Sequence, residues 1–229
     1  MLPVILAPFS WLYGAVTRFR NFLYDNGFKK SDSFDRAVIC VGNLSVGGTG
    51  KTPMIEYLVR LLSKEYKVAI LSRGYDRKTN GFRLAGEQGE DTSTIGENVF
   101  QFFNKFKSEV VVAVCESRVE GINRLLEINN SLNVMVLLLD DAFQHRAVKP
   151  IFSILLTEFS KPFFNDRILP QGRLRESRAG SIRADVVVVT KCNEINEERI
   201  SFFEKSIEEY AGGEADFLFG NKLYPTSVI

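Results

Sequence analysis

The sequence predicts an α/β fold with a mostly parallel β-sheet flanked by helices. Short runs rich in valine, isoleucine and leucine alternate with segments whose apolar residues recur at helical spacing, which is typical of strand–helix–strand units. A glycine-rich loop that follows one of the strands makes the expected fold P-loop NTPase-like. A long apolar stretch at the N-terminus adds a helix that we expect to associate with a membrane.

Six strands are expected, and several of them are apolar at consecutive positions, as in strands that are covered on both faces. They lie at 37–41, 67–72, 109–114, 133–139, 151–156 and 185–190. Helices are expected at 53–62 and 98–106, where apolar residues follow helical spacing. The polar stretch 74–96 is expected to form a long surface loop or a small excursion, and 157–184 a second excursion, because glycines or prolines interrupt them.

The composition is that of a soluble globular protein with one large domain or two small ones: 229 residues, 45% hydrophobic and 25% charged. The 29 basic and 28 acidic residues nearly cancel, so no nucleic-acid partner is expected. Cys40, Cys115 and Cys192 are far apart and lie in or beside apolar runs, which predicts buried free thiols in a reducing cytoplasm rather than a zinc site. His145 is the only histidine.

The N-terminal residues 1–17 carry no charged side chain, and Arg18 and Arg20 follow them. The stretch lacks the basic start of a secretory signal, and with Pro3 and Pro8 it is marginal as a helix that spans a bilayer. A helix that lies in the membrane interface, with the arginines toward anionic lipid, fits better. The alternative is a first helix packed on the protein's own core.

The loop "NLSVGGTGKT" lies between an expected strand and an expected helix, which is the context of a P-loop. Its glycines lack a Cβ, so backbone N–H groups can converge on phosphate oxygens at the start of the helix. Lys51 would reach the β- and γ-phosphates, and the Thr52 hydroxyl would bind magnesium. Ser45 replaces the usual first glycine and can serve if the position needs no positive φ; a tight turn with a surface lysine is the alternative. The expected nucleotide-binding residues are Ser45, Val46, Gly47, Gly48, Thr49, Gly50, Lys51 and Thr52.

Asp140 and Asp141 end an expected buried strand, as a Walker B strand must to place a carboxylate beside magnesium. Which of the two would bind the metal directly stays open, and a solvated acidic pair is the alternative. Thr190 and Lys191 are similar to the element by which GTPases recognise guanine, but Asn193 stands where a carboxylate is needed. This segment is expected to flank a base without strong selection for guanine.

Six segments, in family order, resemble the tetraacyldisaccharide 4′-kinase family, the P-loop lipid kinases of lipid A biosynthesis in Gram-negative bacteria. In that family the P-loop starts with serine or threonine, which accounts for Ser45. The segments are "VGNLSVGGTGKTP" (41–53), "LSRGYDRKTNGF" (71–82), "IGENVFQFF" (95–103), "LLLDDAFQHR" (137–146), "LPQGRLRES" (169–177) and "ADVVVVTK" (184–191).

The resemblance implies ATP- and magnesium-dependent phosphorylation of the 4′-hydroxyl of a tetraacylated glucosamine disaccharide 1-phosphate. The protein would be peripheral or monotopic on the cytoplasmic face of the bacterial inner membrane. Its partners would be the lipid A disaccharide precursor and the membrane surface, and no obligate protein partner is inferred. Residues 1–30 would be the membrane-associating segment and 31–229 the P-loop kinase domain.

Two departures from the family pattern bear on the chemistry. Family members have Gly-Asp-Glu-Pro where this chain has "GENV" at 96–99, and their aspartate resembles a catalytic base, a role that would fall to Glu97. The alternative for Glu97 is a capping box with Thr94 that opens the next helix. Family members also continue well beyond this length and contribute a later histidine, so the chain is expected to lack the C-terminal part.

The remaining motif residues carry weaker predictions. His145 would orient an acidic neighbour, lie near the phosphates or be a hydrogen-bonded structural histidine. Arg73 would neutralise phosphoryl charge, and Arg173 and Arg175 would hold the 1-phosphate or the ATP phosphates, with a solvated surface position as the alternative for each. The expected catalytic residues are Lys51, Glu97, Asp140, Asp141 and His145.

Two other function classes compete with the kinase. One is a P-loop GTPase-like switch or metallochaperone, in which hydrolysis drives a conformational cycle. The other is a truncated module that binds nucleotide without transfer activity.

Overall fold

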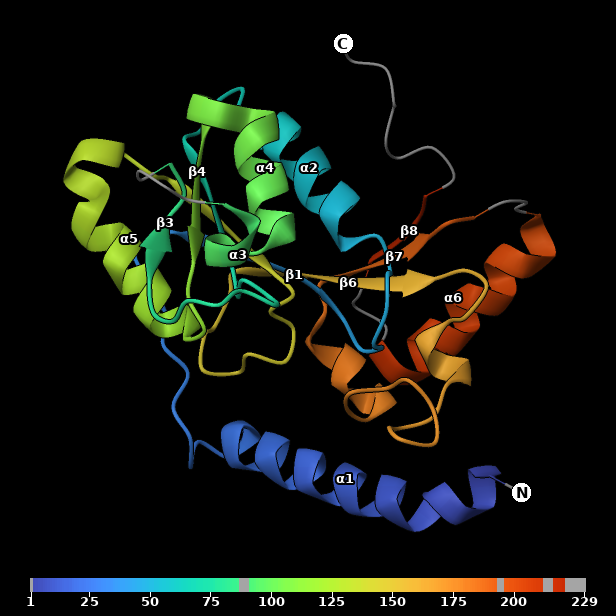
Figure 1. The fold of residues 1–229 in the computed structure, drawn as a ribbon. Coiled ribbons are helices and arrows are strands. Elements are labelled where there is room, and N and C mark those ends of the chain that lie inside the picture. Colours follow the sequence, from blue (N-terminus) through green and yellow to red (C-terminus); the bar gives the residue numbers. More distant parts are fainter. Residues whose placement is uncertain (1, 87–90, 193–195, 212–215, 221–229) are drawn as a thin grey trace. The chain divides into compact units, whose positions relative to one another are not determined.

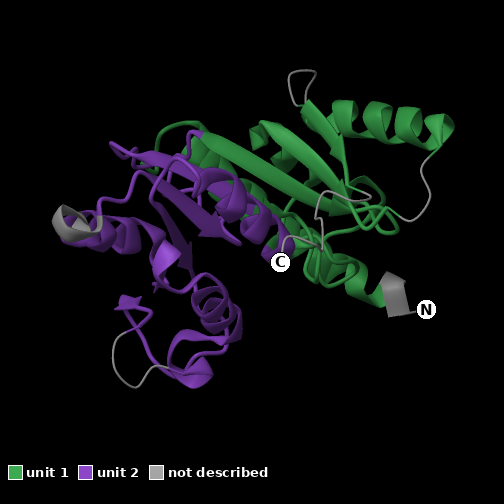
Figure 2. Cartoon of the chain, turned by 90° about the horizontal axis from the view of Figure 1, so that it is seen from above, with its two compact units in different colours: residues 1–30, 42–51, 152–229 green, residues 31–41, 52–151 purple. Residues whose placement is uncertain are grey.

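A computed structural model describes residues 2–86, 91–192, 196–211 and 216–220 (Figure 1). The chain divides into two compact units (Figure 2). Unit 1 comprises residues 1–30, 42–51 and 152–229, and unit 2 comprises residues 31–41 and 52–151. Each unit contains parallel strands flanked by helices, which confirms the predicted α/β class.

Unit 2 is built on strands in the order β3-β4-β2-β5-β1. Neighbouring strands are parallel, except that β3 is antiparallel to β4. Every residue of β2, β4 and β5 is buried, as expected for strands covered on both faces. The bounds are β1 Ala37–Asn43, β2 Val68–Ser72, β3 Arg83–Leu84, β4 Val110–Val114 and β5 Val136–Asp140.

Helices α2, α4 and α5 connect the parallel strands of unit 2. Right-handed crossovers from β1 to β2 and from β2 to β4 run the same way across the sheet, so α2 and α4 lie on one face. The crossover from β4 back to β5 places α5 on the other face (Figure 1). The bounds are α2 Lys51–Leu62, α3 Thr92–Ile95, α4 Glu97–Phe106 and α5 Arg118–Leu132, with a 3₁₀ turn at Lys107–Glu109.

Unit 1 contains strands β6, β7 and β8, which are parallel and adjacent in that order. Helix α6 follows β7 and contributes Phe203, whose ring packs edge-to-face against Phe164 and Phe219. The bounds are β6 Phe152–Glu158, β7 Val186–Thr190, α6 Glu197–Ala211 and β8 Asp216–Phe219, with 3₁₀ turns at Phe163–Asn165 and Arg178–Arg183.

The N-terminal helix α1, Leu2–Asp25, also belongs to unit 1 and contains Pro8. It turns small side chains toward its own unit, since Ser10 and Thr17 are buried together with Gly14. Its large apolar side chains are exposed on the opposite face: Ile5, Phe9, Leu12, Val16 and Phe19. Among the described helices, none has the length and hydropathy needed to cross a bilayer.

The six predicted strands are all present, with ends that differ by up to three residues. Helices α5 and α6 were not predicted, because their apolar residues are few and spread among charged ones. The 74–96 stretch is a small excursion that contains β3 and α3. Cys40, Cys115 and Cys192 are free and buried, as predicted.

Candidate active site

The P-loop follows β1 in unit 1 and leads into α2 at Lys51. Gly47 and Gly50 have φ values of 116° and 84°, which side chains with a Cβ rarely adopt. A Cβ built on Gly47 or on Gly48 would meet no atom within 4 Å. Open space therefore lies beside the loop backbone, where the predicted site needs room for phosphate oxygens.

Hydrogen bonds from neighbouring strands hold the loop in this shape. Asn43, the last residue of β1, donates from Nδ2 to Thr49 Oγ1 at 2.7 Å. The Thr190 hydroxyl at the end of β7 lies 3.0 Å from the carbonyl oxygen of Thr49. Thr190, predicted to flank a base, thus contacts the loop itself, while Lys191 pairs with Glu158. Asn193 lies outside the described residues, so the weak guanine selection stays a prediction.

Ser45 occupies its position without strain. It is not among the described residues with positive φ, so no glycine is needed there. It forms an antiparallel bridge with Leu174, and the Val46 N–H donates to the Arg173 carbonyl at 2.8 Å. The start of the P-loop is therefore held by the segment "LPQGRLRES", a contact that the sequence did not reveal.

The acidic end of β5 lies in unit 2. Val41 of β1 pairs with Asp140 in the parallel register, and the P-loop begins at Asn43, the last residue of β1. Asp140 is 4% exposed, and its Oδ2 accepts a hydrogen bond from Ser72 Oγ at 3.1 Å. Asp141 has φ of 51°, so the chain turns sharply directly after the strand. The two carboxylates thus stand at a fixed strand end, as a Walker B strand requires.

Arg118, the first residue of α5, holds the end of β5 at Asp140. Its role was not predicted from the sequence. Arg118 is 2% exposed, and its guanidinium donates to the carbonyl of Cys115 at 2.8 Å and to the carbonyl of Asp140 at 2.7 Å. Burial lowers the pKa of Arg118 to about 10, while the nearby charges of Asp140 and Asp141 oppose that change. The arginine therefore stays charged at neutral pH and connects the ends of β4 and β5.

Glu97 is the exposed first residue of α4. The prediction that Thr94 and Glu97 form a capping box at the start of this helix is wrong. The N-cap of α4 is Gly96, which has no side chain to cap with, and Thr94 instead completes a capping box with Asp91 at the start of α3. Asp91 accepts hydrogen bonds from Ser93 and Thr94, which lower the pKa of its carboxyl. The role of Glu97 as a base stays a prediction.

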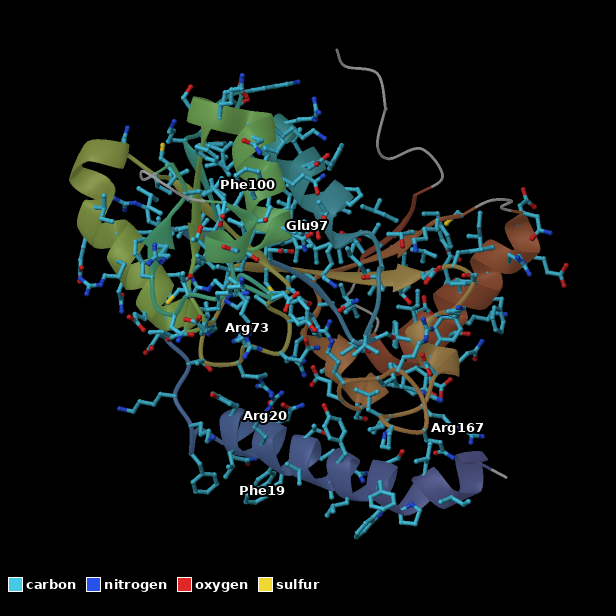
Figure 3. The ribbon with its side chains drawn as sticks, viewed as in Figure 1. Phe19, Arg20, Arg73, Glu97, Phe100 and Arg167 are labelled. Atoms are coloured by element: carbon cyan, nitrogen blue, oxygen red, sulfur yellow. The ribbon has the colours of Figure 1, made fainter. Side chains whose placement is uncertain are left out.

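Close backbone packing places Glu97 near the end of β2. A Cβ on Gly96 would lie 2.9 Å from the Tyr75 carbonyl oxygen and 3.2 Å from Gly74 Cα. Gly96 also has φ of 88°. Arg73 and Glu97, both labelled in Figure 3, each adjoin one of these two glycines in the chain and are exposed. The structure thus brings the predicted base and a predicted phosphate ligand to neighbouring loops of unit 2.

The predicted arginines of unit 1 differ in their surroundings. Arg173 donates from Nε to Asp166 Oδ2 at 2.8 Å, and one of its terminal nitrogens reaches the Lys161 carbonyl, so its guanidinium is held by the protein. Arg175 is half-buried and its N–H donates to the Leu44 carbonyl at 2.7 Å. Arg175 thus contacts the start of the P-loop through its main chain.

A family model for LpxK, tetraacyldisaccharide-1-P 4′-kinase, matches residues 2–216. The chain belongs to this family. It is 56% identical over 192 residues to the tetraacyldisaccharide 4′-kinase of Flavobacterium johnsoniae and 55% identical over 187 residues to that of Bacteroides thetaiotaomicron. The family resemblance predicted from six segments is thereby confirmed.

These alignments cover 84% and 82% of this LpxK-family chain, but 55% and 48% of the two relatives. A crystal structure of LpxK from Aquifex aeolicus in complex with ATP matches it with a TM-score of 0.76 and 40% identity. That match covers 84% of this chain and 60% of the other. The chain thus spans about half the length of the curated relatives named here, and it has the fold of an LpxK.

One further buried group of the LpxK-family chain escaped sequence reasoning. Glu176, in "LPQGRLRES", is 0% exposed, and its two carboxylate oxygens accept hydrogen bonds from Arg183 at 2.8 Å and from Asn21 of α1 at 2.7 Å. The sequence signal was present, since a carboxylate in so arginine-rich a motif has partners close by. Its connection to α1 could not be read, because the two residues are 155 positions apart.

Proposed function

We propose that this chain performs the chemistry for which its family is named. It would transfer a phosphoryl group from ATP to the 4′-hydroxyl of a tetraacylated glucosamine disaccharide 1-phosphate, a step of lipid A biosynthesis. The observation that carries the proposal is the open glycine loop before Lys51, in a chain that belongs to a family of kinases. Residues 31–229 would form the kinase domain and residues 1–30 its membrane-associating segment.

The P-loop fits a triphosphate. The N–H groups of Val46 and Thr49 donate to carbonyls of the protein. In the described part of the chain, the N–H groups of Gly47, Gly48 and Gly50 donate to no carbonyl oxygen of the protein. Those three amides would donate to phosphate oxygens, and Lys51 would neutralise charge on the β- and γ-phosphates. Of the eight residues expected to bind nucleotide, the glycines and Lys51 would make the main contacts.

A magnesium ion fits the oxygens of Thr52, Asp140 and Asp141, which all belong to unit 2. Hydroxyl and carboxylate oxygens are the donors that magnesium prefers. The Ser72 hydroxyl and the Arg118 guanidinium hold Asp140 in place through its side chain and its main chain, which would limit its freedom to turn away. When bound, the ion would neutralise charge on the phosphates.

Glu97 would accept the proton of the 4′-hydroxyl as that oxygen attacks the γ-phosphate. Its place in the first turn of α4 suits a carboxylate, because the N-terminal end of the helix dipole favours negative charge. Arg73 would stabilise charge on the transferred group, and Arg175 would bind phosphate at the start of the P-loop. Arg173 would act through Asp166 by holding the loop. His145 lies half-buried in the turn after Asp141 and would orient that turn.

The outer face of α1 would lie in the membrane interface at the cytoplasmic face of the inner membrane. Phe19 points away from the part of unit 1 on which α1 packs, and Arg20 lies on another side of the helix (Figure 3). Apolar side chains at positions 5, 9, 12, 16 and 19 form one continuous stripe, since they recur at intervals of three and four residues. This face suits a lipid surface, which is also where an acylated substrate resides.

A transfer assay tests the proposal. The chain would be incubated with ATP, magnesium and a detergent-dispersed tetraacylated disaccharide 1-phosphate, and mass spectrometry would look for one added phosphoryl group. We expect transfer by the wild type and by Lys64→Ala, an exposed lysine in the turn after α2, and none by Lys51→Ala. Nucleotide binding without transfer would instead support a nucleotide-binding module, and a clear preference for GTP would support a switch protein.

A further inference from the structure

Within unit 1, residues 168–176 lie against the inner face of α1. The Gln171 N–H donates to Ser10 Oγ at 2.9 Å. A Cβ on Gly14 would approach the Ile168 side chain to 3.1 Å, so the helix backbone lies close to this side chain. Helix α1 therefore packs on this segment through its small residues, while its large apolar residues remain exposed.

The same segment holds the start of the P-loop. Leu174 forms the antiparallel bridge with Ser45, and the N–H of Arg175 donates to the Leu44 carbonyl. Leu44 and Leu174 are both 0% exposed, so the contact is part of a packed core. A shift of this segment must move the backbone that enters the phosphate-binding loop.

Arg175 connects the two contacts directly. Its N–H bonds to the P-loop at Leu44, and its carbonyl oxygen accepts a hydrogen bond from the Tyr13 hydroxyl of α1 at 3.0 Å. One residue farther along, the buried Glu176 carboxylate accepts from Asn21 of α1 and from Arg183. Helix α1 is thus hydrogen-bonded to two consecutive residues of the segment that holds the P-loop.

The inner and outer faces of α1 make this contact sensitive to lipid. In water the exposed stripe that ends at Phe19 favours any rearrangement that buries it. At a lipid surface the stripe is buried, which leaves the inner face with Tyr13 and Asn21 directed at the segment. A ligand that binds one arrangement better than others shifts the population toward it.

We propose that Tyr13 and Asn21 are positioning residues through which a lipid surface bound to α1 strengthens nucleotide binding at the P-loop. They touch neither nucleotide nor lipid acceptor and act through Arg175 and Glu176. The proposal rests on the proposed function, since it assumes a nucleotide at the P-loop and lipid at α1. Because coupling between two binding sites is reciprocal, nucleotide must strengthen lipid binding by the same factor.

The test measures the affinity of the full chain for a fluorescent ATP analogue with magnesium, with and without vesicles of phosphatidylethanolamine and phosphatidylglycerol. Coupling of the usual size would make the wild type bind the analogue about fivefold more tightly on vesicles. In Tyr13→Phe, which keeps the ring and removes only the hydroxyl, this gain should fall below about twofold. Vesicle binding itself should persist in Tyr13→Phe, whereas a variant whose helix α1 had unfolded would lose it. Asn21→Ala should act in the same direction.

Matched controls are Tyr66→Phe, an exposed tyrosine of unit 2, and Asn26→Ala, whose side chain donates to the Phe22 carbonyl within the N-terminal segment. Both should keep the full gain. Equal analogue affinity of the wild type on and off vesicles, with both ligands bound, would overturn the coupling and leave the proposed function standing. A full gain in both Tyr13→Phe and Asn21→Ala would also overturn it. A wild type that binds neither ligand would overturn the coupling and the proposed function together.

Discussion

Replacing Arg118 by methionine tests whether this arginine holds Asp140 and Asp141 in position at the end of β5. The change removes two charge-assisted hydrogen bonds, to Cys115 and Asp140, each worth about 1.5–3 kcal/mol. Against this loss stands the unfavourable burial of the guanidinium, which lowers the pKa of Arg118 to about 10 and costs roughly 3 kcal/mol. Methionine fills much of the same space without charge. The free energy of unfolding should therefore fall by only about 2 kcal/mol, and the fold should survive.

The pH dependence of this difference has a definite sign. Below pH 9 the arginine is charged in both the folded and the unfolded chain, so urea denaturation should give the same difference between wild type and Arg118→Met from about pH 6 to 9. Above the folded pKa of about 10, the unfolded chain holds the proton more tightly than the folded chain. The stability of the wild type should therefore rise relative to the variant in that range.

The same change should also weaken the magnesium-dependent binding of nucleotide. Loss of a group that orients a metal ligand weakens metal binding about tenfold or more, so the affinity for nucleotide should fall in magnesium and stay unchanged in EDTA. Arg124→Met on the same helix is the control, since Arg124 is exposed and forms a surface ion pair with Glu127. If Arg118→Met kept the magnesium dependence of Arg124→Met, the positioning role of Arg118 would be refuted.

Three further outcomes are expected. Gly96→Ala should lower the free energy of unfolding by about 1–3 kcal/mol in urea denaturation, because Gly96 has a positive φ and its Cβ would lie against the Tyr75 carbonyl oxygen. Gly81→Ala, at a position with positive φ but open space, should lower it less, and equal losses would contradict the close packing at Gly96. Glu97→Gln should lower turnover more than ATP affinity, and unchanged turnover would exclude Glu97 as base. Phe19→Asp should lower vesicle partitioning in flotation about tenfold, and unchanged partitioning would remove the lipid-facing role of α1.

The strands and the P-loop could be predicted because their signals are local. Runs of consecutive β-branched residues favour strands that are covered on both faces, and the glycines before Lys51 allow the positive φ values that this loop adopts. Even the question of Ser45 had a local answer, since the residue needed only an ordinary φ. Family membership followed from the same short motifs, because each of them carries its own geometry.

The groups that support the site could not be predicted, because their partners are distant in sequence. Arg118 lies in "CESRVEG", which has the polarity of a surface turn, and only the fold brings it to the Asp140 carbonyl. The capping prediction for Glu97 failed because Thr94 forms its capping box with Asp91, which is the N-cap of α3 and a residue type favoured at that position. The contacts of the inner face of α1 could not be predicted for a similar reason, because its partners, residues 168–176, are distant from it in the sequence.

The most direct test of the central claim is a crystal structure of the chain with a non-hydrolysable ATP analogue and magnesium. We predict phosphate oxygens on the amides of Gly47, Gly48 and Gly50, with the Lys51 ammonium beside them and magnesium on oxygens of Thr52 and the 140–141 pair. Nucleotide bound elsewhere on the chain, with this loop empty and Lys51 turned away from it, would contradict the account.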